Sequence, residues 1–402
     1  MEKQAFEKYL SSDMIMKKLI SLSIIFLLAK AISAQDSIPS FILTAGKLPQ
    51  LAYSTGVDRL GSAKMGYIDT LIPMKVIDTA KNLYKVRLSG YHYAYIDTTY
   101  TQPIADTILP IVLCESWRVK GGDEFDSVSF SLSGRVPYKS WMEIDPSRIK
   151  IELYNVQSNT NWITQLSSAK AVKNVWYEQT ENDVLQVTIE LVKQQHYGYK
   201  IGYNGKSLVL TIRRLPSTAN IKNMTIAIDA GHGGTNLGAS GTTSGILEKD
   251  YALLFAKELQ KILKKQKIKV IMVRETDTTI ENKDRVLWAQ QNNPDIFISF
   301  HLNSSGRNTA KGASTYYKHI GYRSFTQSLL KRLLEIKNLE EFGNIGSFNF
   351  QPIQPTEYPS CLVEIAFLSN EQDEKMIRDP KFRTKVANQV YLGIKDWIKA
   401  WK

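Results

Sequence analysis

The sequence predicts a multidomain protein with a small β-barrel and a β-sandwich, followed by an α/β domain whose mostly parallel sheet is covered by helices. Through residues 40–214, apolar and charged positions alternate with a period of two, which is typical of half-buried strands. From residue 224 onward, strands alternate with helices, which indicates a parallel sheet with helices on both faces. A chain of 402 residues that is 43% hydrophobic is long enough to bury several cores.

The N-terminal half contains two kinds of strand pattern. Residues 40–100 read as short strands between turn residues, and Tyr84, Val86 and Leu88 alternate there with charged positions. A small barrel is the natural way to close such short strands. Residues 110–214 contain longer alternating strands, which favour an antiparallel sandwich with one solvated face per sheet.

The C-terminal half begins after the short linker "LPSTAN", and we predict one domain over residues 220–402. An apolar stripe at helical spacing, which includes Leu254, Phe255 and Leu259, supports the first helix. The predicted order is strand 224–229, helix 248–265, strand 269–274, helix 280–292, strand 295–300, helix 323–336, strand 361–366 and helix 380–400.

Residues 1–34 have the layout of a secretory signal. Lys17 and Lys18 precede an uncharged run that is too short to span a membrane, and small residues follow it. Translation is expected to start at Met14 or Met16, with cleavage near residues 33–35 and no membrane span in the mature form. Removing five lysines and three acids lowers the formal charge from +12 to +10. A basic exported protein suits an acidic polymer at a cell surface and makes nucleic acid an unlikely partner.

The two cysteines, Cys114 and Cys361, fall in different predicted domains and show no metal-binding spacing. We expect both to be buried small residues rather than a disulfide. The sequence also contains no HExxH, no G-x-S-x-G and no phosphate-binding loop, which excludes three common classes of site.

Four chemically active side chains follow the strands of the C-terminal domain. His232 and His301 come after the first and third strands, Glu248 opens the first helix, and Glu364 lies within the last strand. Functional groups collect at the carboxyl ends of strands in open α/β sheets. Two imidazoles and a carboxylate are the ligand set of an open catalytic zinc site, which activates water and polarises a carbonyl. A second carboxylate there can transfer protons, so these parts suit amide hydrolysis.

Each of these four residues also has a purely structural explanation. Glu248, for example, is favoured at a helix N-terminus by the helix dipole. The combination favours a site, because the charge of Glu364 within "LVEIAF" would be costly without a purpose. For His92, His196 and His319, which have no partner motif, we expect structural roles.

Five ordered motifs resemble the zinc-dependent N-acetylmuramoyl-L-alanine amidases of the type 3 family, which are bacterial cell-wall hydrolases. The resemblance covers about residues 224–400, and the motifs read "IAIDAGHGG", "GILEKDYAL", "VRETD", "DRVLWAQQNNPDIFISFHLNS" and "LVEIAFLSNEQDEKMIRD". The resemblance implies cleavage of the amide between N-acetylmuramic acid and L-alanine in peptidoglycan.

The resemblance also implies roles for individual residues. His232, Glu248 and His301 would bind one Zn²⁺, and Glu364 would be the catalytic acid/base. Asp229 would lie near His232 and fix the tautomer of that ligand. Asn303 and Arg285 match further positions of the pattern, where they would have supporting roles.

Resemblances outside the motifs concern targeting and regulation. Residues 40–100 resemble a bacterial SH3-type domain, and residues 110–214 resemble the AMIN-type sandwich. The short segment after His301 leaves no room for the inhibitory helix that some family members insert, although an activator protein remains a possible partner. Residues 341–360 depart from the family's usual basic residue followed by glycine.

Two other functions remain open at this point. A zinc peptidase that cuts within the stem peptide would use the same metal chemistry. A non-catalytic wall-binding protein is the second alternative, although the presence of all four chemical residues argues against it.

Overall fold

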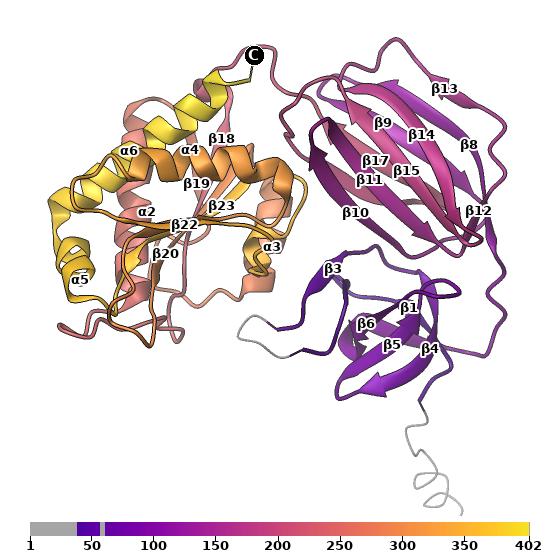
Figure 1. Cartoon of the computed structure of the whole chain (residues 1–402), viewed down its shortest axis with the longest axis horizontal. Coiled ribbons are helices and arrows are strands. Elements are labelled where there is room, and N and C mark those ends of the chain that lie inside the picture. The colour runs from indigo at the N-terminus through magenta and orange to yellow at the C-terminus, as the bar shows by residue number, and fades with distance from the viewer. Residues whose placement is uncertain (1–37, 57–60, 402) are drawn as a thin grey trace, which may run out of the picture.

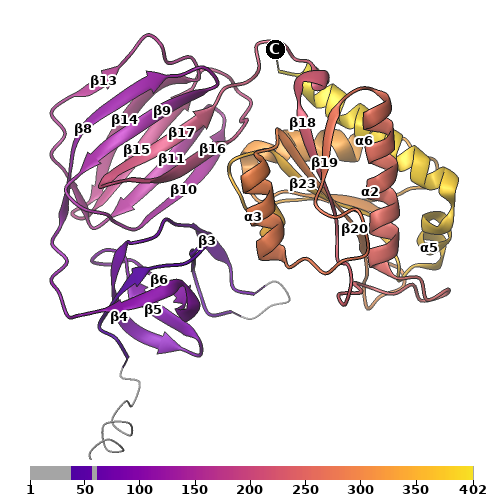
Figure 2. The same ribbon diagram turned by 180° about the vertical axis from the view of Figure 1, so that it is seen from behind.

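A computed structural model describes residues 38–56 and 61–401 (Figure 1). The predicted signal segment, residues 1–34, lies outside the described residues. Figures 1 and 2 show two units of β-sheet next to each other and a third unit of helices and strands beside them. None of the helices in the described ranges is long and apolar enough to cross a bilayer.

The first unit is one antiparallel sheet of seven strands in the order β3-β2-β6-β5-β4-β1-β7. Val86 and Leu88 are buried, as their alternation with charged residues predicts. The sheet reaches slightly beyond the predicted limits of 40–100. Its strands are β1 Phe41–Thr44, β2 Gln50–Ala52, β3 Lys64–Tyr67, β4 Pro73–Ala80, β5 Leu83–Arg87, β6 Tyr93–Asp97 and β7 Thr101–Ile104.

The second unit contains two sheets, one in the order β10-β11-β15-β14 and the other in the order β12-β8-β9-β17-β16, with β13 paired to β8. Trp117 and Phe130 pack edge to face in its core, with ring centroids 4.8 Å apart. The strands are β8 Val112–Gly121, β9 Phe125–Leu132, β10 Tyr138–Ile144, β11 Ser147–Tyr154, β12 Val156–Ser158, β13 Ile163–Gln165, β14 Val172–Glu181, β15 Val184–Leu191, β16 Tyr199–Asn204 and β17 Ser207–Arg213.

The third unit is the predicted α/β domain. Its sheet has the order β19-β18-β20-β23-β21-β22, and every pair is parallel except β21 with β23. Its elements are β18 Thr225–Ala230, α2 Glu248–Lys265, β19 Lys269–Met272, α3 Asn282–Asn292, β20 Ile296–Asn303, β21 Ala313–Tyr316, α4 Arg323–Leu333, β22 Glu341–Ile345, β23 Ser360–Phe367, α5 Glu371–Arg378 and α6 Pro380–Lys399.

The two faces of this sheet are covered differently. Ile298 and Phe300 point into a large core with α2, α4 and α6, whereas Phe297 packs on the opposite face, where α3 lies. Figures 1 and 2 both place α3 on the side that faces the two sheet units. Residues that share the face of Phe297 therefore point toward the rest of the protein.

Most predicted elements of the α/β domain occur within a few residues of their expected ends, and α2 has the predicted bounds. The apolar stripe of α2 differs at one position, because Leu254 is exposed while Ala252 and Ala256 make the contact with the core. The sequence analysis missed β22 and α5. The first is a short edge strand whose residues are exposed or half-buried, and the second is an eight-residue helix that Asn370 caps.

The two cysteines, Cys114 and Cys361, are both buried and free, as predicted.

Candidate metal centre

The loop after β18 holds His232 in an unusual backbone conformation. Its φ angle is +58°, in the left-handed region that few side chains adopt, and glycines flank it on both sides. Gly231 is required for another reason, because a Cβ atom there would lie 2.3 Å from the imidazole of His301. The glycines of "AGHGG" thus allow the two histidines to approach one another.

Glu248, the first residue of α2, joins these histidines. Its Oε1 atom lies 3.0 Å from Nε2 of His232 and 2.9 Å from Nδ1 of His301. The other oxygen, Oε2, accepts a hydrogen bond of 2.8 Å from the backbone amide of Ala239. Three residues that are far apart in the sequence therefore converge at the carboxyl end of the sheet.

Glu248 and His232 each shift the pKa of the other. Burial raises the pKa of Glu248, but hydrogen bonds and positive charge from the two histidines outweigh burial and hold the pKa well below its usual range. Burial lowers the pKa of His232, and the hydrogen bond and charge of Glu248 reverse that effect and raise it. Protons therefore compete with any cation for these groups.

The geometry fits a single divalent cation. One ligand atom from each of His232, Glu248 and His301 lies within 4.8 Å of the others. The Nε2 atom of His301 is buried and has no hydrogen-bond partner among the described residues. Two imidazoles and a carboxylate leave room in a tetrahedral shell for a fourth ligand.

Glu364 lies directly beside this cluster. In the parallel pairing of β20 with β23 it is the register partner of His301. Side chains at paired positions project from the same face of a sheet, so Glu364 and His301 point to the α3 side. The four residues that the sequence singled out are thus brought to one edge of the sheet.

Asp229 does not hold the imidazole of His232, in contrast to the prediction. It is fully buried, forms a salt bridge with Arg285 and accepts a hydrogen bond of 2.7 Å from Ser299. Arg285 in turn donates to the backbone oxygen of His232 at 2.6 Å. Asp229 points inward from β18 and is linked to the His232 loop through Arg285, which contacts both.

The group that holds the His232 ring is Asn236, which the sequence analysis did not identify. Its side-chain oxygen lies 2.8 Å from Nδ1 of His232. The asparagine four residues after His232 is a sequence signal for this contact. A single sequence makes it a weak signal. Metal-binding histidines commonly have such a partner on the second ring nitrogen.

Two further residues near the site were also missed. Phe350 packs edge to face on the ring of His301, with centroids 5.3 Å apart. Glu374 accepts hydrogen bonds of 2.8 Å from the amides of Thr243 and Ser244, which fixes the loop before Glu248. Phe350 lies in the segment 341–360 that departs from the family pattern, and no periodicity marks either residue.

The remaining histidines have local partners. His196 contacts the backbone oxygen of Glu143 at 2.7 Å, and His319 contacts that of Gln354 at 2.7 Å. His92 lies 2.8 Å from the hydroxyl of Ser89. The described segment 304–312 between β20 and β21 contains no helix.

Comparison with known families gives two matches. Residues 226–396 match the N-acetylmuramoyl-L-alanine amidase family, and residues 115–212 match the AMIN domain. The first range contains His232, Glu248, His301 and Glu364, and the second falls within the two-sheet unit.

Curated relatives and solved structures match a part of the chain. A probable cell wall amidase LytH of Staphylococcus epidermidis is 34% identical over 185 residues, which is 46% of this chain and 62% of that protein. A probable cell wall amidase LytH of Staphylococcus aureus is 32% identical over 181 residues, which is 45% of this chain and 60% of that protein. The chain thus spans less than two thirds of these relatives. The catalytic domain of the amidase CwlV from Bacillus (Paenibacillus) polymyxa is 33% identical, covering 44% of this chain and 99% of that one, with a TM-score of 0.42.

Proposed function

Because residues 226–396 belong to the N-acetylmuramoyl-L-alanine amidase family and residues 115–212 match the AMIN domain, we propose that the chain is a peptidoglycan amidase. Its substrate is the amide between the lactyl group of N-acetylmuramic acid and L-alanine of the stem peptide. The observation that carries the proposal is the convergence of His232, Glu248 and His301 beside Glu364.

His232, Glu248 and His301 would hold one Zn²⁺. When bound, this ion supplies a more acidic water and a Lewis acid for the scissile carbonyl. The support is the donor set and the closeness of the three ligand atoms. Asn236 and Arg285 fix the position of His232 through its ring and its backbone oxygen.

Glu364 acts as the general acid/base. Its position beside His301 puts its carboxylate within the same group of side chains as the metal ligands. It accepts a proton from the attacking water and donates a proton to the nitrogen of L-alanine as the amide bond breaks. Proton transfer by a positioned carboxylate typically contributes a factor of about 10² to 10⁴ in rate.

The N-terminal units place the catalytic domain on its substrate. The first unit acts as an SH3-like barrel over residues 40–100, and the second acts as an AMIN-like sandwich over residues 110–214. The predicted secretory signal directs the enzyme to the periplasm or the cell wall. There it acts in cell-wall turnover or in daughter-cell separation. An activator protein is a further partner of this proposal.

Product analysis tests this function. Purified sacculi digested by the full chain should yield free amino groups on L-alanine together with glycan that retains its lactyl groups, and a chelator should stop the reaction. New ends within the stem peptide would identify a peptidase instead. A chain that solubilises nothing with zinc present would point to a wall-binding protein and contradict the proposal.

A further inference from the structure

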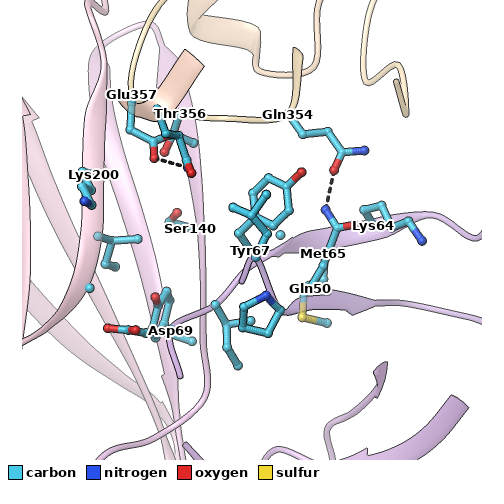
Figure 3. A pocket seen from close by; sticks show the side chains of 18 of the residues that line it. Gln50, Lys64, Met65, Tyr67, Asp69, Ser140, Lys200, Gln354, Thr356 and Glu357 are labelled. Carbon is cyan, nitrogen blue, oxygen red and sulfur yellow. Dashed lines mark hydrogen bonds between the residues drawn. The ribbon is translucent and has the colours of Figure 1, made fainter. Parts of the chain in front are cut away.

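A cavity of about 430 Å³ lies where the three units meet (Figure 3). The first unit contributes Gln50 and the strand β3, the two-sheet unit contributes Ser140 and Lys200, and the catalytic domain contributes Lys318 and residues 354–357. The volume lies within the range of small-molecule sites in proteins. We call this space the inter-unit cavity.

Direct hydrogen bonds between the units fix its walls. Tyr199 and Thr356 exchange two bonds of 2.8 Å, one from the Tyr199 amide to the Thr356 carbonyl and one from the Thr356 hydroxyl to the Tyr199 carbonyl. The amide of Tyr203 donates to Asp69 at 2.6 Å, and Gln50 donates to Gln354. The cavity is therefore formed by the fold itself, without a partner.

A second cavity of about 370 Å³ lies next to this space. It shares Gln50, Lys64 and Gln354 with the inter-unit cavity and is also lined by Phe350. The two cavities lie side by side, and we call them together the tract; Phe350, at one end of it, packs on the ring of His301. A chain extending from the reaction centre would pass along it.

The charged groups of the inter-unit cavity favour an anion. Three lysines line it, at positions 64, 200 and 318, against Asp69 and Glu357. Both acids are already engaged, since the amides of Thr70 and Tyr203 donate to Asp69 and the side-chain amide of Gln290 donates to Glu357. Three lysines against two carboxylates that already accept hydrogen bonds give the lining a net positive formal charge.

Two donors point to where an anion would bind. Lys318 is half-buried, forms no salt bridge within the described part of the chain, and has its pKa lowered by burial and by nearby Lys64. The hydroxyl oxygen of Tyr67 is buried, with the side chain of Gln351 beside it. Figure 3 shows the Tyr67 ring in the middle of the cavity, between Gln50 and the catalytic domain.

We propose that the inter-unit cavity binds a carboxylate of the stem peptide, with Lys318 and Tyr67 as its donors. This inference rests on the proposed amidase function, in which the peptide extends from the scissile amide along the tract past Phe350. The two N-terminal units then form a wall of the substrate site, in addition to any role in targeting.

The test compares three substrates on the full chain with zinc bound. They are N-acetylmuramoyl-L-alanine, a muramoyl peptide with free carboxylates, and the same peptide with its carboxylates amidated. We expect Lys318→Met to raise KM for the carboxylate peptide about tenfold, as loss of one charged contact does. Its kcat should be unchanged, and Tyr67→Phe should raise KM several-fold.

The same variants should hydrolyse the short substrate and the amidated peptide as the wild type does. Lys283→Met is the matched control, because Lys283 lies over the ring of Tyr100 between the same units but outside this cavity. It should hydrolyse all three substrates like the wild type. Circular dichroism of each variant verifies its fold.

Binding supplies a second readout that does not depend on turnover. In isothermal titration calorimetry, a free peptide that begins with L-alanine and carries carboxylates should bind the wild type about tenfold more tightly than Lys318→Met. Equal affinity for the acidic and amidated peptides would overturn the inference while leaving the amidase function intact. Failure of every form to hydrolyse the short substrate would instead refute the proposed function.

Discussion

The buried pair of Asp229 and Arg285 gives the sharpest test of how the fold supports the metal centre. Their side chains are 0% and 2% exposed, and Arg285 also donates to the backbone oxygens of Ala230 at 2.8 Å and His232 at 2.6 Å. Asp229→Asn keeps the size of the side chain but removes the charge that neutralises Arg285. Breaking one partner of a buried pair costs about 3–5 kcal/mol, because the other charge remains buried.

We therefore expect Asp229→Asn to lower the free energy of unfolding of the catalytic domain by about 3 kcal/mol, measured by urea denaturation. Arg285→Met should cost a similar amount, and the double variant should cost much less than the sum because no unpaired charge remains. Zinc affinity should fall about 10- to 100-fold in each single variant, since the His232 loop loses its support.

The matched control is Asp396→Asn, which breaks a salt bridge to Arg332 at the surface. Exposed pairs contribute little, so this variant should unfold almost like the wild type. An Asp229→Asn variant that loses less than about 1 kcal/mol, or a double variant whose loss is additive, would refute the reasoning about the buried pair.

Three further predictions concern single residues. Gly231→Ala should abolish zinc binding, measured by metal content, while the fold persists, because the new Cβ would lie 2.3 Å from the ring of His301. Asn236→Ala should weaken zinc binding about 10- to 100-fold by calorimetry, because the ring of His232 loses its partner. Burial lowers the pKa of His196 from 6.5 to about 4. The unfolded chain therefore binds the extra proton first, and His196 should lower the free energy of unfolding by about 3 kcal/mol as the pH drops from 6.5 to 4. Burial also lowers the pKa of His319 to about 4, so His196→Gln should remove about half of the dependence that urea denaturation shows over this pH range.

The sequence analysis predicted elements and site residues correctly where a local pattern determines the structure. The period of 3.6 residues marked α2 with its bounds, the strand ends marked His232 and His301, and a charge within an apolar strand marked Glu364. The convergence of these residues follows from parallel pairing, which places strand ends at one edge of the sheet.

Contacts between distant segments could not be predicted in this way. Asp229 was expected near the ring of His232, but the direction of its side chain depends on which face of β18 is buried and on where Arg285 reaches. Phe350 lies in a segment without periodicity, and its contact with His301 depends on the path of the chain between β22 and β23. The inter-unit cavity likewise arises from the docking of three units, which no local pattern encodes.

The rate at which Glu364→Gln releases peptide from purified sacculi, at matched zinc content, tests the central claim most directly. We predict one zinc ion per chain in this variant and a rate at least about 100-fold below that of the wild type, because the proton carrier is lost. Glu371→Gln, which changes an exposed glutamate at the start of α5, should retain the wild-type rate. A Glu364→Gln variant with full zinc content and the wild-type rate would contradict the account.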